Sequence, residues 1–292
     1  MLPNFLIIGA PRASTSYLVN CLNEHPEILI AQNGYTHDIH FLNPDTSHVV
    51  NQNYHKGIEW YEELFSAVKN EKAIGEKTAT YFTEKTTPEY IKKHLGSNVK
   101  LIVILRNPLE RANSDFWYHR GQFPKNYCLI DVFRNSDNDK LQIAQAGKYF
   151  ENYNNYLNYF ERENFHFIVF DDLRDNPIKI FTEIFNFLNV NNYFTPSQIN
   201  EKINSAYKDD GIKFKLKSLG GKIKSNYPNL FKVLNENKIL QKLRDNLHKP
   251  SNKDSKYPPL NNDEIDFLQN YYYDDIKNMG KIINRDLVKL WL

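Results

Sequence analysis

Short apolar runs that end in turn or polar residues recur along the chain. They are NFLIIG (4–9), EILIA (27–31), KAIGE (72–76), KLIVILR (100–106) and HFIVFDD (166–172). Segments with helical spacing lie between them, among them SYLVNCLNEH and TPEYIKKHL. Strands that alternate with helices predict a parallel sheet with helices on both of its faces.

Two longer segments carry helical patterns of their own. Residues 140–165 are expected to form one long helix, whose aromatic residues recur three or four apart and pack against the sheet. Near the end of the sequence, NNDEIDFLQNYYYDDIKNMGKII predicts a further helix. Asn262 is its expected cap, and Asp263 and Glu264 stand in the first turn, where acidic groups favour the helix dipole.

Composition narrows the class of protein. The chain has 292 residues, 41% of them hydrophobic, so we expect a single domain over 1–292. The 37 basic and 35 acidic residues give a net charge of +2, which argues against a nucleic-acid binder. Two cysteines, Cys21 and Cys128, predict no disulfide framework. Because no apolar run approaches the ~20 residues of a membrane span and no signal peptide is recognisable, we expect a cytoplasmic protein without a membrane segment.

The first strand leads into a loop, IIGAPRASTSYL (7–18), that resembles a phosphate-binding loop with changes. In the pattern G-x-x-x-x-G-K-[ST], Gly9 fits the first glycine and Ser16 the final hydroxyl. Ser14 replaces the second glycine, and Thr15 replaces the lysine that reaches the outer phosphates of a nucleoside triphosphate. Binding of ATP is therefore poorly supported.

The same loop still offers groups that bind an anion. Backbone N–H groups from Ala13 to Ser16 open a helix, and Arg12 brings a fixed positive charge to them. The alternative is an ordinary strand-to-helix turn with a serine cap.

A second basic motif follows the central strand, in LIVILRNPLERANSDF (101–116). Arg106 stands at the carboxyl end of that strand, where open α/β sheets bind ligands. Ser114 follows on the next helix, near enough to share one phosphate with Arg106. For Arg111, a surface arginine on a solvated helix is the plausible alternative.

These motifs together resemble those of the sulfotransferases that use 3′-phosphoadenylyl sulfate (PAPS). IIGAPRASTSYL is similar to their 5′-phosphosulfate loop, and ILRNPLERANSDF to their 3′-phosphate motif R-[DN]-P-x-x-R-x-x-S-x-[YF]. HDIHFLN, NYHKGIEWYEELF and GEKTATYF resemble segments of the heparan sulfate N- and 3-O-sulfotransferase branch, and GKYFENYNNYLNYF, FIVFDDLRDNP and DLVKLW resemble later family segments. The resemblance covers most of the chain, with the motifs in family order.

The resemblance implies a fold, a reaction and two anion sites. The fold is an α/β, P-loop-like three-layer sandwich around a parallel sheet of about five strands. The reaction transfers a sulfuryl group from PAPS to an acceptor, with no metal, and gives PAP. Arg12 with Ala13, Ser14, Thr15 and Ser16 would hold the 5′-phosphosulfate, and Arg106 with Ser114 the 3′-phosphate. Since arginine keeps its proton, the role of Arg12 in catalysis would be electrostatic.

The resemblance also implies catalytic residues. Asp38 falls where the heparan branch has its glutamate base, His40 falls on that motif's histidine and His37 on its lysine. Asp38 is the first candidate for the base, and His40 or His37 is the alternative, because histidine titrates near neutral pH. Lys77 matches the lysine of the E-K-[TS] segment and would face the transferred group or the acceptor.

The acceptor side is expected to take a small molecule, since a polyanion groove would need a larger basic surface. The candidates for contacts with this acceptor are His37, Trp60, Tyr81 and Tyr149. Within 204–260, a basic, glycine-punctuated segment lies where the family closes over the cofactor. Its candidate lysines are Lys208, Lys213, Lys215, Lys217 and Lys222, with Lys217 and Lys222 preferred; a solvated basic face is the alternative.

Three other functions stay open from the sequence. The same chemistry can sulfate an amine, a guanidine or a sugar in place of a small hydroxyl acceptor. A nucleotide kinase would use FIVFDD as a Walker B strand, with Asp171 on Mg²⁺. A protein that binds PAP without turnover would also fit the departures at Arg12 and Asp38.

Overall fold

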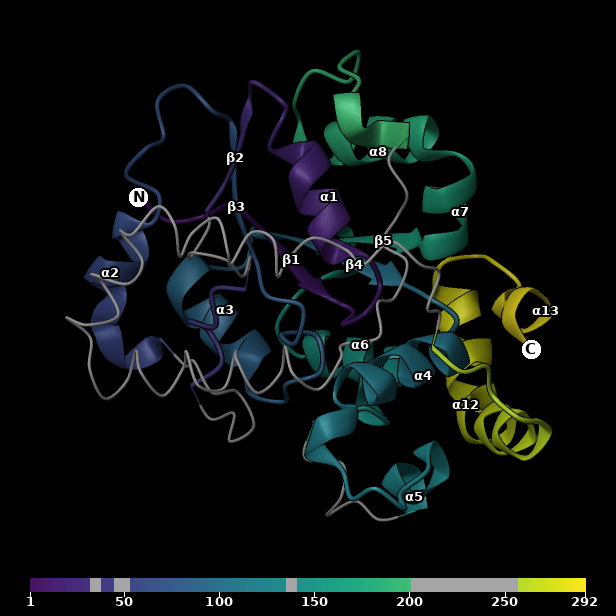
Figure 1. Cartoon of the computed structure of the whole chain (residues 1–292). Coiled ribbons are helices and arrows are strands. Elements are labelled where there is room, and N and C mark those ends of the chain that lie inside the picture. The colour runs from purple at the N-terminus through teal and green to yellow at the C-terminus, as the bar shows by residue number, and fades with distance from the viewer. Residues whose placement is uncertain (32–37, 45–52, 135–140, 201–256) are drawn as a thin grey trace, which may run out of the picture. The chain divides into compact units, whose positions relative to one another are not determined.

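The computed structural model describes residues 1–31, 38–44, 53–134, 141–200 and 257–292 (Figure 1). The chain divides into two compact units, which we describe separately. The first comprises Met1–Asp115, Cys128–Asn204 and Leu260–Leu292, and the second comprises Phe116–Tyr127 and Ser205–Pro259. The expected single domain over 1–292 stays a prediction.

A parallel sheet forms the centre of the first unit. Its strands are β1 (Phe5–Gly9), β2 (Ile28–Ile30), β3 (Ala73–Lys77), β4 (Lys100–Leu105) and β5 (Phe165–Val169). They lie in the order β2-β3-β1-β4-β5, and every pair of neighbours is parallel. The predicted α/β class with about five parallel strands is therefore confirmed.

The apolar runs predicted these strands because both faces of the sheet are covered. All five residues of β1 are buried, and so are Leu101–Leu105 of β4. A strand buried on both faces reads as a continuous apolar run, which is the pattern of KLIVILR. The last run ends early, however, because β5 stops at Val169 and FDD begins the next helix.

Helices cover both faces of the sheet, as Figure 1 shows for α1 and α8 on one side and α3 and α6 on the other. The helices of the described residues are α1 (Thr15–Leu22), α2 (Gly57–Glu63), α3 (Thr87–Leu95), α4 (Pro108–Tyr118), α5 (Leu129–Arg134), α6 (Tyr149–Tyr156), α7 (Phe170–Asp175), α8 (Pro177–Leu188), α12 (Asn262–Ile282) and α13 (Leu287–Trp291). Right-handed crossovers explain this arrangement. The chain leaves β1 towards one edge of the sheet and leaves β3 towards the other edge, so the helices of the two connections cover opposite faces.

The predicted long helix over 140–165 is wrong. Only α6 (Tyr149–Tyr156) is a regular α-helix there, and a short 3-10 turn precedes it at Gln145–Gly147. The hydroxyl of Tyr272 donates to the carbonyl of Ala144 at 2.8 Å, and the ring of Tyr272 leaves no room for a Cβ at Gly147. Tyr149, Tyr153 and Tyr156 of α6 are buried as predicted, whereas Phe150 is partly exposed, and long-range contacts shorten the helix.

The helix predicted near the end of the sequence is confirmed as α12. Its cap is Asn261, one residue before the expected Asn262, and the Asn261 side chain accepts from the Glu264 amide at 2.9 Å. Glu264 reaches back to the Asn261 amide at 3.0 Å, which completes a capping box.

Candidate active site

The sheet order places a topological switch point at the carboxyl ends of β1 and β4. These strands are neighbours, yet the helices that follow them, α1 and α4, belong to crossovers in opposite directions. Open α/β sheets bind ligands at such a switch point. The loop 10–14 and Arg106 both lie there, because each directly follows one of the two strands.

The loop after β1 has a backbone shaped to direct amides. Arg12 and Ser14 have φ angles of 65° and 66°, in the left-handed region that costs non-glycine residues free energy. Alternation of conformations of this kind turns successive N–H groups toward one point, where an anion can bind. Gly9 lets the loop approach its neighbours, because a Cβ there would lie 2.8 Å from the Phe82 Cβ.

Hydrogen bonds join the two basic motifs. The Arg12 Nε donates to the Ser114 Oγ at 3.3 Å, and the Arg106 Nη1 donates to the carbonyl of Arg12 at 3.0 Å. Thus the structure brings together Arg12, Arg106 and Ser114 although they lie far apart in the sequence. Ala13 is buried, and Thr15 and Ser16 form the first turn of α1, where N–H groups lack helical acceptors.

Arg106 is held in place from two sides. Its Nη2 lies 3.0 Å from the Oε2 of Glu110 in the first turn of α4. The Tyr149 hydroxyl donates to the Arg106 carbonyl at 2.7 Å and accepts from the Arg106 amide at 3.3 Å. Because Tyr149 is completely buried, its role is to position Arg106, and the structure does not support the predicted contact with an acceptor.

Arg111 is buried, so the alternative of a surface arginine is wrong. It pairs with Asp115 at 2.8 Å and donates to the carbonyl of Ile143. The Asp115 carboxylate more than offsets the desolvation of the guanidinium and raises the pKa of Arg111. Arg111 therefore anchors the turn before α6 to α4.

The second half of the site lies at the carboxyl end of β3. The Lys77 Nζ lies 2.7 Å from the Asp38 Oδ2, and the Ala79 amide donates to the Asp38 Oδ1 at 2.8 Å. The backbone of Asp38 bridges that of Lys77 in parallel, which extends the sheet by one short step. Asp38 and Lys77, predicted from separate motifs, are therefore direct partners.

The surroundings of Asp38 favour its charged form. Burial by itself raises the pKa of this carboxyl, but the Lys77 ammonium and the Ala79 amide lower it below its usual value. The side chain of Asp38 keeps 26% of its surface exposed, so an acceptor can still reach it. His40 lies two residues on, with a left-handed φ of 51°, and its Nδ1 lies 3.5 Å from the side-chain Nδ2 of Asn43.

Sequence reasoning missed Glu76, a carboxyl buried beside this pair. Its Oε1 accepts from the hydroxyls of Tyr61 at 2.8 Å and Tyr81 at 3.0 Å, and its Oε2 from Thr78 at 3.3 Å. Burial raises its pKa to about 7, although the three hydroxyls act in the opposite direction. A charged residue inside the apolar run KAIGE was the signal that could have identified it.

The remaining predicted acceptor contacts are placed differently. Tyr81 is completely buried, and its hydroxyl accepts the amides of Phe41 and Leu42 at 3.0 and 2.9 Å, so it positions a segment of backbone instead of facing an acceptor. Trp60 is partly exposed on α2, and the Lys56 Nζ lies 4.3 Å from the centre of its ring. His37 and the lysines Lys208, Lys213, Lys215, Lys217 and Lys222 lie outside the described residues, as does most of 204–260.

Asp171, the residue a kinase would need for Mg²⁺, has other partners. Its Oδ2 accepts from the Trp291 Nε1 at 2.9 Å, and Arg174 lies 3.2 Å from its Oδ1. Among the residues that the structure describes, no three His, Cys, Asp or Glu side chains gather as a metal site. In the same part of the chain, every helix is too short or too polar to cross a bilayer.

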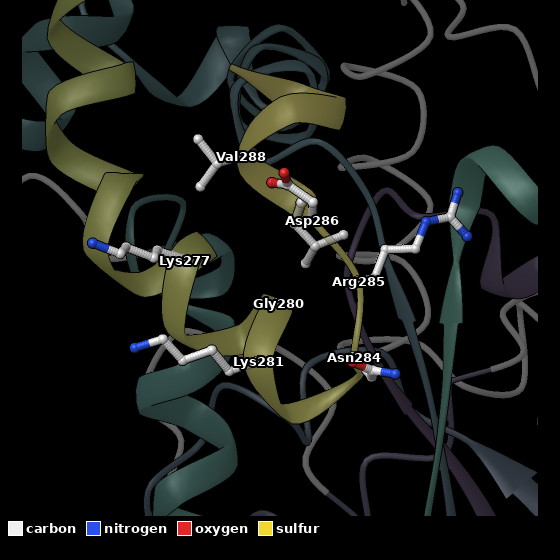
Figure 2. A pocket seen from close by; sticks show the side chains of 8 residues that line it. Lys277, Gly280, Lys281, Asn284, Arg285, Asp286 and Val288 are labelled. Carbon is white, nitrogen blue, oxygen red and sulfur yellow. The ribbon is translucent and has the colours of Figure 1, made fainter.

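A pocket of about 300 Å³ lies apart from these groups, between α12 and α13 (Figure 2). It is lined by Lys277, Gly280, Lys281, Asn284, Arg285, Asp286, Leu287 and Val288. None of these was predicted as a site residue, and the Arg285 guanidinium in it is paired with Asp172.

Comparison with known proteins shows the family to which the chain belongs. A family model described as a sulfotransferase domain matches residues 2–280. The chain belongs to the sulfotransferase family. The resemblance of its motifs to that family is thereby confirmed.

Several sulfotransferases illustrate the breadth of the similarity. Heparan sulfate glucosamine 3-O-sulfotransferase 5 of Mus musculus is 32% identical over 197 residues, which are 65% of this chain and 54% of that protein. Bifunctional heparan sulfate N-deacetylase/N-sulfotransferase 4 of Mus musculus is 27% identical over 97% of this chain and 30% of that protein. This chain thus spans about half, or less, of the curated relatives.

A solved structure supports the fold. The sulfotransferase from Alicyclobacillus acidocaldarius superposes with a TM-score of 0.67 at 19% identity, over 99% of this chain and 98% of that one. Mouse sulfotransferase SULT7A1, solved in complex with PAP, has a TM-score of 0.50 at 16% identity and covers 94% of this chain and 85% of its own. At these identities the similarity concerns the fold.

Proposed function

We propose that this sulfotransferase transfers a sulfuryl group from PAPS to a hydroxyl of a small-molecule acceptor, giving a sulfate ester and PAP. The observation that carries the proposal is the joining of Arg12, Arg106 and Ser114 at the switch point of the sheet, beside the Asp38–Lys77 pair. PAPS carries an anion at each end of its nucleoside, and the site has a cationic group for each.

The donor set of the site fits these two anions. Ser14, Thr15 and Ser16 offer backbone and hydroxyl donors at the start of α1, with the Arg12 charge next to them. Arg106 has a planar guanidinium that can hold a phosphate through two parallel hydrogen bonds, with Ser114 as a further donor. Arg106 would give up its exposed Glu110 partner for that purpose.

When bound, PAPS supplies the sulfuryl group and provides PAP as the leaving group. Arg12 and the loop amides stabilise negative charge that grows on the leaving side. Lys77, fixed by Asp38, presents a positive charge at the carboxyl end of β3. Each of these groups is held before the reaction begins, so little reorganisation is needed.

Asp38 is the proposed general base. It is ionised because of Lys77, it is partly exposed, and each of its oxygens keeps a lone pair beyond the two hydrogen bonds it accepts. It would take the proton of the acceptor as the new bond to sulfur forms. His40 is the alternative base on the same segment, and His37 is a third candidate.

A small acceptor is supported by charge. The net charge of +2 gives little attraction for a long polyanion. The relatives named after heparan sulfate make an amine or a sugar acceptor the alternative.

The first experiment measures thermal stabilisation by PAP and, separately, by ATP with Mg²⁺. At ~100 times its Kd a ligand adds roughly 2.7 kcal/mol to the free energy of unfolding, which a melting curve detects. We expect PAP to stabilise the wild type and the control Arg174→Ala, a surface arginine, whereas Arg106→Ala loses most of the shift. Stabilisation by ATP–Mg²⁺ without stabilisation by PAP would contradict the proposal.

The second experiment identifies the acceptor class. Transfer of radiolabelled sulfate from PAPS is measured with phenols, alkyl alcohols, amines and desulfated heparan oligosaccharides. Turnover of the small alcohols or phenols is the expected result. Turnover of the oligosaccharides alone would replace the small acceptor with a polymer, and binding of PAP without any turnover would indicate a protein that has lost catalysis.

A further inference from the structure

One buried carboxyl, Glu76, is linked to the catalytic segment through two hydroxyl groups. The Thr78 Oγ1 accepts the amides of Ile39 and His40, at 3.0 and 3.1 Å. The Tyr81 hydroxyl accepts the next two amides, those of Phe41 and Leu42. Four consecutive amides of one segment are therefore held by two side-chain oxygens.

The hydroxyl groups of Thr78 and Tyr81 both donate to the same carboxylate. A hydroxyl has one proton to donate and two lone pairs to accept with, and in Thr78 and Tyr81 two backbone amides occupy the accepting side. Both donate to Glu76, Tyr81 to its Oε1 at 3.0 Å and Thr78 to its Oε2 at 3.3 Å. All three side chains are buried, so water does not compete for these bonds.

The segment held in this way carries the proposed catalytic groups. Asp38 precedes Ile39, and His40 lies within the four residues. The φ of 51° at His40 is unfavourable for a non-glycine residue and persists only where surrounding contacts fix the backbone. The carbonyls are held as well, since the Asn53 side chain donates to Ile39 at 2.6 Å and the Asn53 amide to His40 at 2.9 Å.

We propose that Glu76 is a positioning residue: it orients the hydroxyls of Thr78 and Tyr81, which fix the segment 39–42 and thereby place Asp38 and His40. The effect on turnover rests on the proposed function, whereas the effect on the backbone does not. Glu76 itself touches neither substrate, because its side chain on β3 is completely buried.

Tyr61 provides a matched control within the same cluster. Its hydroxyl donates to the Glu76 Oε1 at 2.8 Å, as that of Tyr81 does, and it is equally buried. No amide of the segment 39–42 donates to it, and its ring, which stacks on Phe41 at 4.2 Å, is kept in Tyr61→Phe. A general loss of stability would therefore appear in both Tyr61→Phe and Tyr81→Phe. A loss of positioning would appear only in Tyr81→Phe.

The first test is amide hydrogen exchange, resolved to single residues, on the protein without PAPS. We expect Tyr81→Phe to speed exchange at Phe41 and Leu42, and Thr78→Val to speed it at His40, by about tenfold for each lost bond. The Ile39 amide also donates to the Lys77 carbonyl at 3.2 Å, so it should respond less. Glu76→Gln, which keeps only one accepting oxygen, should speed exchange at His40 or at the Phe41–Leu42 pair.

Two results would overturn the proposal. The first is that Tyr61→Phe speeds amide exchange at residues 39–42 as much as Tyr81→Phe does. The second is that Glu76→Gln leaves the exchange rates of these amides unchanged. If Glu76→Gln does not fold, the pair Thr78→Ser and Thr78→Val still decides, since serine keeps the hydroxyl and should exchange as the wild type does.

The second test measures turnover with the acceptor found for the wild type. We expect Glu76→Gln, Tyr81→Phe and Thr78→Val to lower kcat by about tenfold or more, with the Kd for PAP changed less than about twofold. Tyr61→Phe and Thr78→Ser should keep the wild-type kcat. A wild type without sulfuryl transfer would defeat the proposed function, and the exchange data would still decide the role of Glu76.

Discussion

The two halves of the site are built in different ways. The half at β1 and β4 uses cationic side chains whose bonds can be exchanged: Arg106 pairs with an exposed glutamate, and Arg12 donates to the Ser114 hydroxyl. The half at β3 uses side chains that neighbours hold in place: Lys77 and Glu76 are buried, and the partly exposed Asp38 accepts from Lys77 and from the Ala79 amide. The first construction suits a ligand that comes and goes, and the second suits groups that must stay in position for chemistry.

The largest expected effect separates the halves by function. Asp38→Asn removes the proposed base but keeps its size, so kcat should fall about 10²- to 10⁴-fold, the usual contribution of a general base. The Kd for PAP should stay within a few-fold of the wild type, because Asp38 lies at β3. Steady-state rates and calorimetric titration with PAP give the two quantities. An unchanged kcat would transfer the role to His40, for which His40→Ala is the next variant.

The next effect concerns stability in the buried half. The pKa of Glu76 is raised from 4.5 to about 7, so between these pH values the unfolded chain loses a proton that the folded chain retains. The free energy of unfolding should therefore fall by about 3 kcal/mol as the pH rises from below 4.5 to above 7. Urea denaturation of the wild type and of Glu76→Gln at several pH values isolates this contribution as a difference. A difference that is constant with pH would contradict the raised pKa.

A smaller effect tests how Lys77 acts on Asp38. Since Lys77 lowers the pKa of Asp38, Lys77→Met should raise it, and the acid limb of kcat/KM should move to higher pH. Lys72→Met is the control, because Lys72 pairs with Glu27 at the surface. A limb that stays in place would mean that the titrating group is not Asp38.

The smallest effect belongs to the exchangeable half. Glu110→Gln removes the carboxylate that competes for Arg106, so PAP should bind about twofold more tightly, in keeping with the small free energy of an exposed ion pair. Glu183→Gln on α8 removes an ion pair of the same spacing, with Lys179, and should leave the Kd unchanged. Weaker binding of PAP to Glu110→Gln would show that the ion pair prepares Arg106 for its ligand.

The fold was largely predictable from sequence, because apolar runs covered on both faces identify parallel strands directly. The predicted runs match β1–β5 to within a residue or two, apart from the last, whose end forms α7. The break in the long helix predicted over 140–165 could not be predicted from the sequence. The turn there depends on Arg111 and Tyr272, which bond to the carbonyls of Ile143 and Ala144 from distant parts of the chain.

The candidate site divides in the same manner. Arg12 and Arg106 could be found because each follows the end of a strand, β1 or β4, and parallel strands end on one edge of the sheet. Asp38 and Lys77 were indicated only by the resemblance of their segments to those of the sulfotransferase family. The partners of Glu76 could not be found, since aromatic residues at helical spacing predict burial and not the direction of a hydroxyl. Tyr81 and Tyr149 were predicted to contact the acceptor, whereas their hydroxyls bond to backbone groups.

The central place of β1 also has a consequence for how the protein is made. Phe5–Gly9 is completely apolar, yet its neighbours in the sheet, β3 and β4, are translated only after many further residues. At ordinary ribosome speeds roughly five to twenty seconds pass before β4 emerges. During that interval the nascent chain exposes an apolar segment whose partner strands have not yet been made. We therefore expect chaperones that bind nascent chains to raise the yield of folded protein in a recombinant host.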